Sequence, residues 1–196
     1  MNGPEHARTG LVVLDMLNPY EHRDAEPLAS SVARQLPAMV RLVERARSQE
    51  RPVIYVNDNH GDWSACRSEL QQRALAGRHP ELVEPIAPDQ ADAFLTKARH
   101  SAFYETQLDY LLRERGIERV VLLGQVTEQC VLYSALDAYV RHLAIVVPSD
   151  AVAHIHPELA DAALQMMDTN MSAEIVHSDR FDRTSDRRAI SARAQR

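Results

Sequence analysis

Cys130 lies where a thiol would be reactive. Residues 120–123 form a short, uninterrupted apolar run, which is the pattern of a parallel strand buried on both faces. Helical spacing of apolar residues begins at Thr127, so Cys130 is expected in the first turn of a helix just beyond that strand. Unpaired backbone N–H groups and the helix dipole favour a thiolate there. Because free cysteine is also commonly a small buried hydrophobe, position alone leaves packing and reactivity both open.

Two further ionisable residues follow predicted strands. Residues 10–15 (GLVVLD) form a second buried-strand pattern that ends in Asp15, and a short strand at 93–96 runs into Lys97. The carboxyl ends of parallel strands share one edge of the sheet, so the acid, the cation and the thiol can converge there. Asp15 would accept the thiol proton, Lys97 would hold negative charge, and the thiolate would attack a carbonyl. Taken singly, the Asp is more often a cap or turn residue and the Lys a solvated charge.

The elements that must position these residues alternate along the chain. Strands are predicted at residues 10–15, 52–57, 93–96, 120–123, 143–147 and 173–176. Helices are predicted at residues 27–49, 64–75, 106–114, from 127 onward, and at 157–170. Pro37 indicates a kink or break in the first helix, and Gly124 the end of its strand. Such alternation predicts an α/β fold of three α-β-α layers, with a mostly parallel, Rossmann-like sheet of about six strands and helices on both faces.

Composition limits the class of protein. The chain has 196 residues, 45% of them apolar, and a formal charge of -6, which suits one domain over residues 1–178 and a charged, poorly ordered tail at 179–196. Two cysteines do not make a disulfide framework. The absence of an apolar leader or span predicts a cytoplasmic protein with no membrane partner. The acidic balance argues against nucleic acid as a partner.

Three stretches of the sequence resemble a known family. LVVLDMLNPY, KARHSAFYETQLDYLL and LLGQVTEQCVLYSALDA occur in this order across nearly the whole chain. They resemble the isochorismatase-like cysteine hydrolases, a superfamily of nicotinamidases, N-carbamoylsarcosine amidohydrolases, ureidoacrylate amidohydrolases and isochorismatase itself. The resemblance implies a catalytic triad of Asp15, Lys97 and Cys130, and a cis peptide bond at Gln125–Val126. It also implies an oxyanion hole made by the backbone N–H groups of Val126 and Cys130, and a homo-oligomer, either dimer or tetramer.

The function implied is hydrolysis of the C–N bond of a small amide or ureido compound through a thioester acyl-enzyme. Two alternatives stay open. One is an isochorismatase-type vinyl-ether hydrolase, which need not use a thiol. The other is a non-catalytic interaction or sensor protein that keeps the fold and a reactive cysteine. No histidine is evidently placed as a general base for Cys130, which disfavours a Cys-His hydrolase.

Five residues are candidates for contacting a small planar substrate. The aromatic side chains of Tyr20, Trp63 and Tyr104 would form a wall, and the amides of Asn18 and Asn57 would bind its polar end. Ordinary core packing is the other explanation for each aromatic residue.

The sequence also raises the question of whether the protein binds a metal ion. Some members of the family bind a divalent ion through an Asp-x-His motif, and Asp58-Asn59-His60 superficially matches it, with His79 as a remote third ligand. A metal site needs three or four ligands in fixed geometry, and no second histidine lies nearby in the sequence. We therefore expect a polar loop and no cofactor.

Overall fold

A computed structural model describes residues 9–181, and its centre is one sheet whose strands all pair in parallel. The strand order is β3-β2-β1-β4-β5-β7, with the short β6 pairing to the end of β4. The seven strands are β1 (Thr9–Leu14), β2 (Val53–Asp58), β3 (Ala93–Lys97), β4 (Arg119–Gln125), β5 (Ala144–Pro148), β6 (Val152–Ala153) and β7 (Glu174–Val176). This confirms the predicted α/β class and the parallel sheet.

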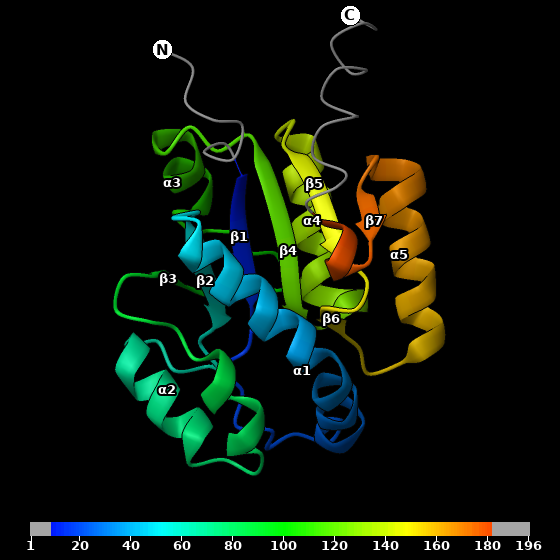
Figure 1. Cartoon of the computed structure of the whole chain (residues 1–196). Helices are drawn as coiled ribbons and strands as arrows, with labels where there is room; N and C mark the ends of the chain where they lie inside the picture. Colours follow the sequence, from blue (N-terminus) through cyan, green and yellow to red (C-terminus); the bar gives the residue numbers. More distant parts are fainter. Residues whose placement is uncertain (1–8, 182–196) are drawn as a thin grey trace, which may run out of the picture.

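Helices cover both faces of the sheet, which makes the three predicted layers (Figure 1). They are α1 (Ala25–Ser48), α2 (Arg67–Leu75), α3 (Leu108–Glu114), α4 (Leu132–Val140) and α5 (Pro157–Met171). Short 3-10 turns lie at Pro80–Leu82, Glu84–Ile86 and Ser178–Arg180. A π-helical turn, Thr127–Val131, leads from β4 into α4 and contains Cys130.

The two-sided burial of the sheet explains the unbroken apolar runs. In β1, Leu11 and Val13 pack in the core beneath α1, whereas Val12 and Leu14 pack in the core on the opposite face with residues of α3, α4 and α5. Successive side chains of a strand point to opposite faces, so a strand covered on both sides must be apolar at every position.

The helix α1 is continuous through Pro37, so the chain does not break there. Pro37 is exposed, while its neighbours Leu36, Ala38 and Met39 are buried against the sheet. Proline removes one internal hydrogen bond of a helix, and packing of the apolar face offsets that loss.

Gly124 does not end its strand, because β4 continues to Gln125. The glycine has a φ of +112°, and a Cβ atom added there would lie 2.2 Å from the carbonyl oxygen of Leu14 in the neighbouring strand. The absent side chain therefore lets β4 pass close to β1 just before the turn that carries Cys130. The prediction that Gly124 terminates the strand was wrong, because backbone approach rather than chain reversal requires this glycine.

We expect Gly124→Ala to lower the free energy of unfolding by about 3 kcal/mol or more, since the added methyl group both clashes and demands an unfavourable φ. Chemical denaturation monitored by circular dichroism measures the loss. Gly116→Ala is the matched control, because Gly116 also has a positive φ of 63° but open space around its Cβ position. That control should cost only about 1 kcal/mol. Equal losses in both variants would contradict the close-approach explanation.

The folded chain extends slightly beyond the predicted domain boundary. Phe181 is only 4% exposed and belongs to the core beneath α1, with the Arg51 guanidinium 5.5 Å above its ring. Phe181 therefore packs on the domain, and the part of the predicted tail at 182–196 lies outside the described residues. Among the helices of residues 9–181, none combines the length and the apolar character that a bilayer span requires.

Candidate active site

The structure brings Asp15, Lys97 and Cys130 together at the carboxyl edge of the sheet. Asp15 follows β1, Lys97 is the last residue of β3, and Cys130 lies in the turn after β4. The Lys97 ammonium lies 2.9 Å from Asp15 Oδ2 and donates a 3.5 Å hydrogen bond to the Cys130 sulfur. All three residues are buried. A buried cation thus links the carboxylate to the thiol.

Neighbouring groups fix the Asp15 carboxylate. Its Oδ1 accepts a 2.7 Å hydrogen bond from the backbone N–H of Asp58, while its Oδ2 faces Lys97. The Asp58 carboxylate lies 3.6 Å from the same ammonium on its other side. Because both oxygens of Asp15 have partners, the carboxylate is oriented before any substrate binds.

Burial and charge decide the protonation states. Burial alone would lower the pKa of Lys97, but Asp15, Cys130 and Asp58 outweigh it, so the pKa of Lys97 is raised and the ammonium stays charged. Burial raises the pKa of the Cys130 thiol, the Asp15 charge raises it further, and Lys97 opposes both. The resting sulfur is therefore a thiol that needs a base, and Asp15 is the carboxylate beside it.

The turn that carries the thiol is anchored to Asp15 by the side chain of Gln125, a residue that the sequence had indicated only for its cis peptide bond. The peptide bond Gln125–Val126 is cis, as the resemblance implied. The buried side chain of Gln125 donates a 2.6 Å hydrogen bond to the carbonyl oxygen of Asp15. On the other side of the turn, Thr127 Oγ1 donates to the carbonyl oxygen of Ala153 in β6. These bonds fix where the backbone at Val126 and the thiol lie.

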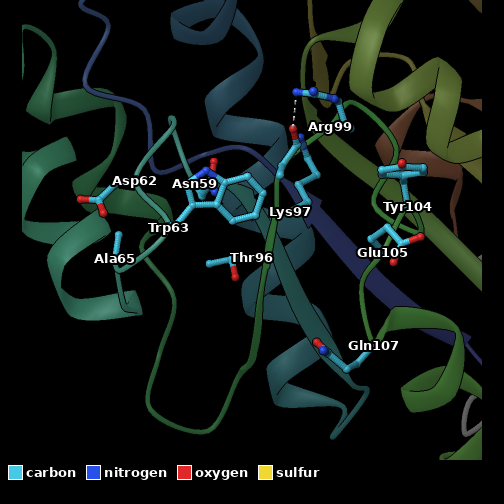
Figure 2. Close-up of a pocket in the computed structure, with 11 residues that line it drawn as sticks. Asn59, Asp62, Trp63, Ala65, Thr96, Lys97, Arg99, Tyr104, Glu105 and Gln107 are labelled. Atoms are coloured by element: carbon cyan, nitrogen blue, oxygen red, sulfur yellow. Dashed lines mark hydrogen bonds between the residues drawn. The ribbon is translucent and has the colours of Figure 1, made fainter.

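A cavity of about 540 Å³ lies beyond the ends of β2 and β3, and Lys97 is the one of the three converging residues that lines it. Figure 2 shows the Trp63 indole and the Tyr104 ring on opposite sides of Lys97, so these two predicted substrate residues do line the cavity. The remaining polar lining was not among the five candidate residues; it comes from Asn59, Asp62, Thr96, Arg99, Glu105 and Gln107. Asn59, Asp62, Thr96 and Arg99 lie at or shortly after the ends of β2 and β3, and that position was their signal in the sequence.

The other three predicted substrate residues do not line this cavity. Tyr20 is 0% exposed, burial raises the pKa of its phenol, and its hydroxyl lies 3.4 Å from Gln125 Oε1. Asn18 accepts a hydrogen bond from the backbone N–H of Tyr20. Asn57 accepts from the N–H of Leu17 at 2.8 Å and donates to its carbonyl oxygen at 3.1 Å. The polar groups of these three residues form hydrogen bonds within the protein and fix the loop after β1. The sequence alone does not show these hydrogen bonds, because they depend on the folded chain.

The residues of the Asp-x-His motif do not converge on a common point. Asp58 faces Lys97, the His60 ring nitrogen Nε2 lies 2.9 Å from a backbone carbonyl oxygen, and His79 Nδ1 lies 3.1 Å from Glu81 Oε1. Within residues 9–181, no three side chains of His, Cys, Asp or Glu cluster as a metal ion would require. These residues therefore do not fit the divalent ion that the motif suggested.

His100 lies next to the thiol, although the sequence had indicated no histidine there. Its Nδ1 atom is 3.9 Å from the Cys130 sulfur, and its ring stacks on Tyr133 of α4. The loop after β3 passes over the start of α4 and is held there by a hydrogen bond from the N–H of Ala102 to the Ser134 hydroxyl. The prediction that no histidine lies beside Cys130 was wrong, because distance along the sequence from Cys130 does not show that the loop after β3 passes over the start of α4. The signal available was that His100 follows Lys97 by three residues.

Comparisons with known proteins agree with this architecture. The family model described as the isochorismatase domain matches residues 9–180. YaaI of Bacillus subtilis, described as an uncharacterized isochorismatase family protein, is 38% identical over 175 residues, which cover 89% of this chain and 97% of YaaI. Ureidoacrylate amidohydrolase RutB of Methylorubrum extorquens is 38% identical over 106 residues, 53% of this chain and 43% of RutB.

A solved structure extends the comparison to three dimensions. N-carbamoylsarcosine amidase from Thermoplasma acidophilum has a TM-score of 0.68 and 34% sequence identity, with 88% of this chain and 97% of that chain covered. The family match begins at the first residue of β1 and ends just before Phe181, so it includes Asp15, Lys97 and Cys130. With the parallel sheet and the converging acid, cation and thiol, these matches show that the chain belongs to the isochorismatase family of hydrolases.

Proposed function

We propose that this protein hydrolyses the C–N bond of a small amide or ureido compound, with Cys130 as nucleophile. One observation carries the proposal: the buried Lys97 ammonium lies 2.9 Å from Asp15 and 3.5 Å from the Cys130 sulfur. A base, a charge-stabilising cation and a thiol in mutual contact are what covalent catalysis on a carbonyl requires. The amidohydrolase and amidase named among the relatives support the same reaction class.

In the first half of the reaction Asp15 takes the proton of Cys130, and the sulfur forms a bond to the substrate carbonyl carbon. The carbonyl oxygen becomes an oxyanion, which the backbone N–H groups of Val126 and Cys130 stabilise by about 3 kcal/mol per donor. When the intermediate collapses, the C–N bond breaks and the nitrogen leaves with the proton held by Asp15. A thioester remains on Cys130.

In the second half, water replaces the nitrogen group. Asp15 takes a proton from the water, the hydroxide oxygen bonds to the thioester carbon, and the C–S bond breaks. The sulfur recovers the proton, and the acid product leaves. Lys97 stays protonated throughout, so it balances the charge that moves between Asp15 and the sulfur.

The test is release of ammonia from a panel of small carboxamides and ureido compounds, including nicotinamide, ureidoacrylate and N-carbamoylsarcosine. We expect at least one to release ammonia with the parent protein and none with Cys130→Ala. Full turnover by Cys130→Ala would refute the nucleophile. Cleavage of isochorismate without ammonia release would favour the vinyl-ether alternative, and inertness toward the whole panel would favour an interaction or sensor protein.

The aromatic pair on the cavity wall is expected to bind the substrate without taking part in the chemistry. Trp63 is 84% exposed and faces the cavity, so its indole is available to stack on a planar amide. We expect Trp63→Ala to raise KM about fivefold with little change in kcat, since an aromatic stacking contact contributes about 1 kcal/mol. Tyr110→Ala is the control, because Tyr110 is exposed on α3 outside the cavity. A fall in kcat at constant KM would contradict this role.

We also propose that no metal takes part, because Asp58 contacts Lys97 and the nearby histidine rings face other partners. Elemental analysis of protein purified without chelator tests this. A stoichiometric transition metal would refute it.

As to partners, we propose a homo-oligomer, a dimer or tetramer, and neither nucleic acid nor membrane. Apolar side chains exposed on the neighbouring helices α4 and α5, among them Leu136, Val140, Leu159 and Met166, support self-association. Light scattering measures the mass, and a monomer would refute the oligomer.

A further inference from the structure

We propose that His100 is a further catalytic residue, which hydrogen-bonds the Cys130 sulfur and, when protonated, stabilises its thiolate. The inference rests on the proposed role of Cys130 as nucleophile, and it adds a fourth member to the site. It makes the reactivity of the thiol depend on pH near neutrality.

The position of the ring carries the proposal. His100 Nδ1 lies 3.9 Å from the Cys130 sulfur, within the longer reach of hydrogen bonds to sulfur, and Lys97 contacts the same sulfur at 3.5 Å. The imidazole stacks on Tyr133 with ring centroids 5.5 Å apart and an interplanar angle of 26°. Ser101 donates a 2.6 Å hydrogen bond to Asp137 of α4, so the loop just after His100 is held against α4.

His100 differs from the other groups near the Cys130 sulfur because its side chain is exposed to solvent. Lys97 and Asp15 are buried, whereas His100 is exposed, so the histidine connects the thiol to solvent protons. Lys97 remains charged across the physiological range because its pKa is raised. Histidine is the side chain whose ordinary change of charge falls between pH 5 and 8.

The other charged and titratable groups around His100 already have partners or are distant from the sulfur. Asp15 after β1 and Asp58 on β2 face Lys97. Asp137 on α4 pairs with Arg141 and accepts a hydrogen bond from Ser101. Arg99, next to His100 in the loop, donates to the carbonyl oxygen of Ala98, and Tyr133 on α4 stacks on the imidazole.

The sign of the effect follows from the charge. A protonated His100 places a positive charge beside the sulfur, which favours the thiolate and lowers the thiol pKa. The neutral ring lacks that charge and gives only a hydrogen bond. The advantage that His100 confers on thiolate formation is therefore present on the acid side and fades as pH rises.

The experiment measures alkylation of Cys130 by iodoacetamide, a neutral reagent, from pH 5.5 to 9. All proteins carry Cys66→Ser, because Cys66 is an exposed free thiol that would also react. Serine is a good cap for α2, which begins after Cys66, so this background should keep its fold. His100→Phe keeps an aromatic ring over Tyr133 and removes the nitrogens, while His100→Gln keeps hydrogen-bonding groups that do not titrate.

We expect the parent to be alkylated about fivefold faster than His100→Phe at pH 5.5, the size expected for a unit charge about 4 Å away in a water-like dielectric. The two rates should converge above pH 8. His100→Gln should also lack the acid-side advantage. Peptide mass spectrometry quantifies labelling at Cys130, and circular dichroism establishes that each variant is folded.

Two outcomes would overturn the proposal. One is equal alkylation of the parent and both variants at every pH. The other is a difference of constant size from pH 5.5 to 9, which indicates altered packing rather than a titrating charge. Failure of the proposed function is separately visible, because ammonia release by Cys130→Ala reports the nucleophile whereas alkylation reports the sulfur itself.

Discussion

Cys130→Ser is expected to lower kcat for amide hydrolysis by about 10⁴-fold or more, because serine is a far weaker nucleophile at the pH where Asp15 is the base. The hydroxyl is close to the thiol in size, so the buried turn Thr127–Val131 should keep its packing. Steady-state ammonia release measures the loss, and the midpoint of thermal unfolding should change little.

Cys66→Ser is the matched control for that substitution. Cys66 is the other free cysteine of the described chain, and it is exposed at the start of α2. It should keep parental turnover. If Cys66→Ser lost activity and Cys130→Ser kept it, the assignment of the nucleophile would be reversed.

Asp15→Asn is expected to have opposite effects on turnover and on thiol reactivity. Loss of the base should lower kcat by about 10³-fold. Loss of the negative charge should lower the pKa of the Cys130 thiol, because Asp15 is a cause of its elevation. Alkylation at pH 7 should therefore become faster while hydrolysis becomes slower.

The pH profile checks the sign of that effect. Alkylation of the parent should keep rising with pH beyond the usual titration range of cysteine, because burial and Asp15 hold the proton on the sulfur. In Asp15→Asn the profile should move toward lower pH. Asp58→Asn is the comparison, since Asp58 lies 3.6 Å from Lys97 but is not among the largest causes of the raised thiol pKa. Slower alkylation of Asp15→Asn would contradict the electrostatic account.

The sequence alone determined six of the seven strands and the grouping of Asp15, Lys97 and Cys130. Strands covered on both faces must be apolar at every position, so β1 and β4 were legible without knowledge of their partners. Parallel pairing then forces the residues after them to one edge, which is why Asp15, Lys97 and Cys130 could be grouped from positions far apart in the chain. The apolar pattern of the strands and the shared carboxyl edge of a parallel sheet were enough to group these three residues.

Only the tertiary structure decided which other side chains contact the candidate active site. Tyr20 follows β1 and Asn57 lies near the end of β2, so both looked like substrate residues, but hydrogen bonds across the fold use their polar groups. Gly124 allows a close approach between strands that no local pattern reports. His100 reaches the sulfur because the loop after β3 crosses the start of α4. A side chain's partner depends on where other segments pass, and periodicity along one segment does not contain that information.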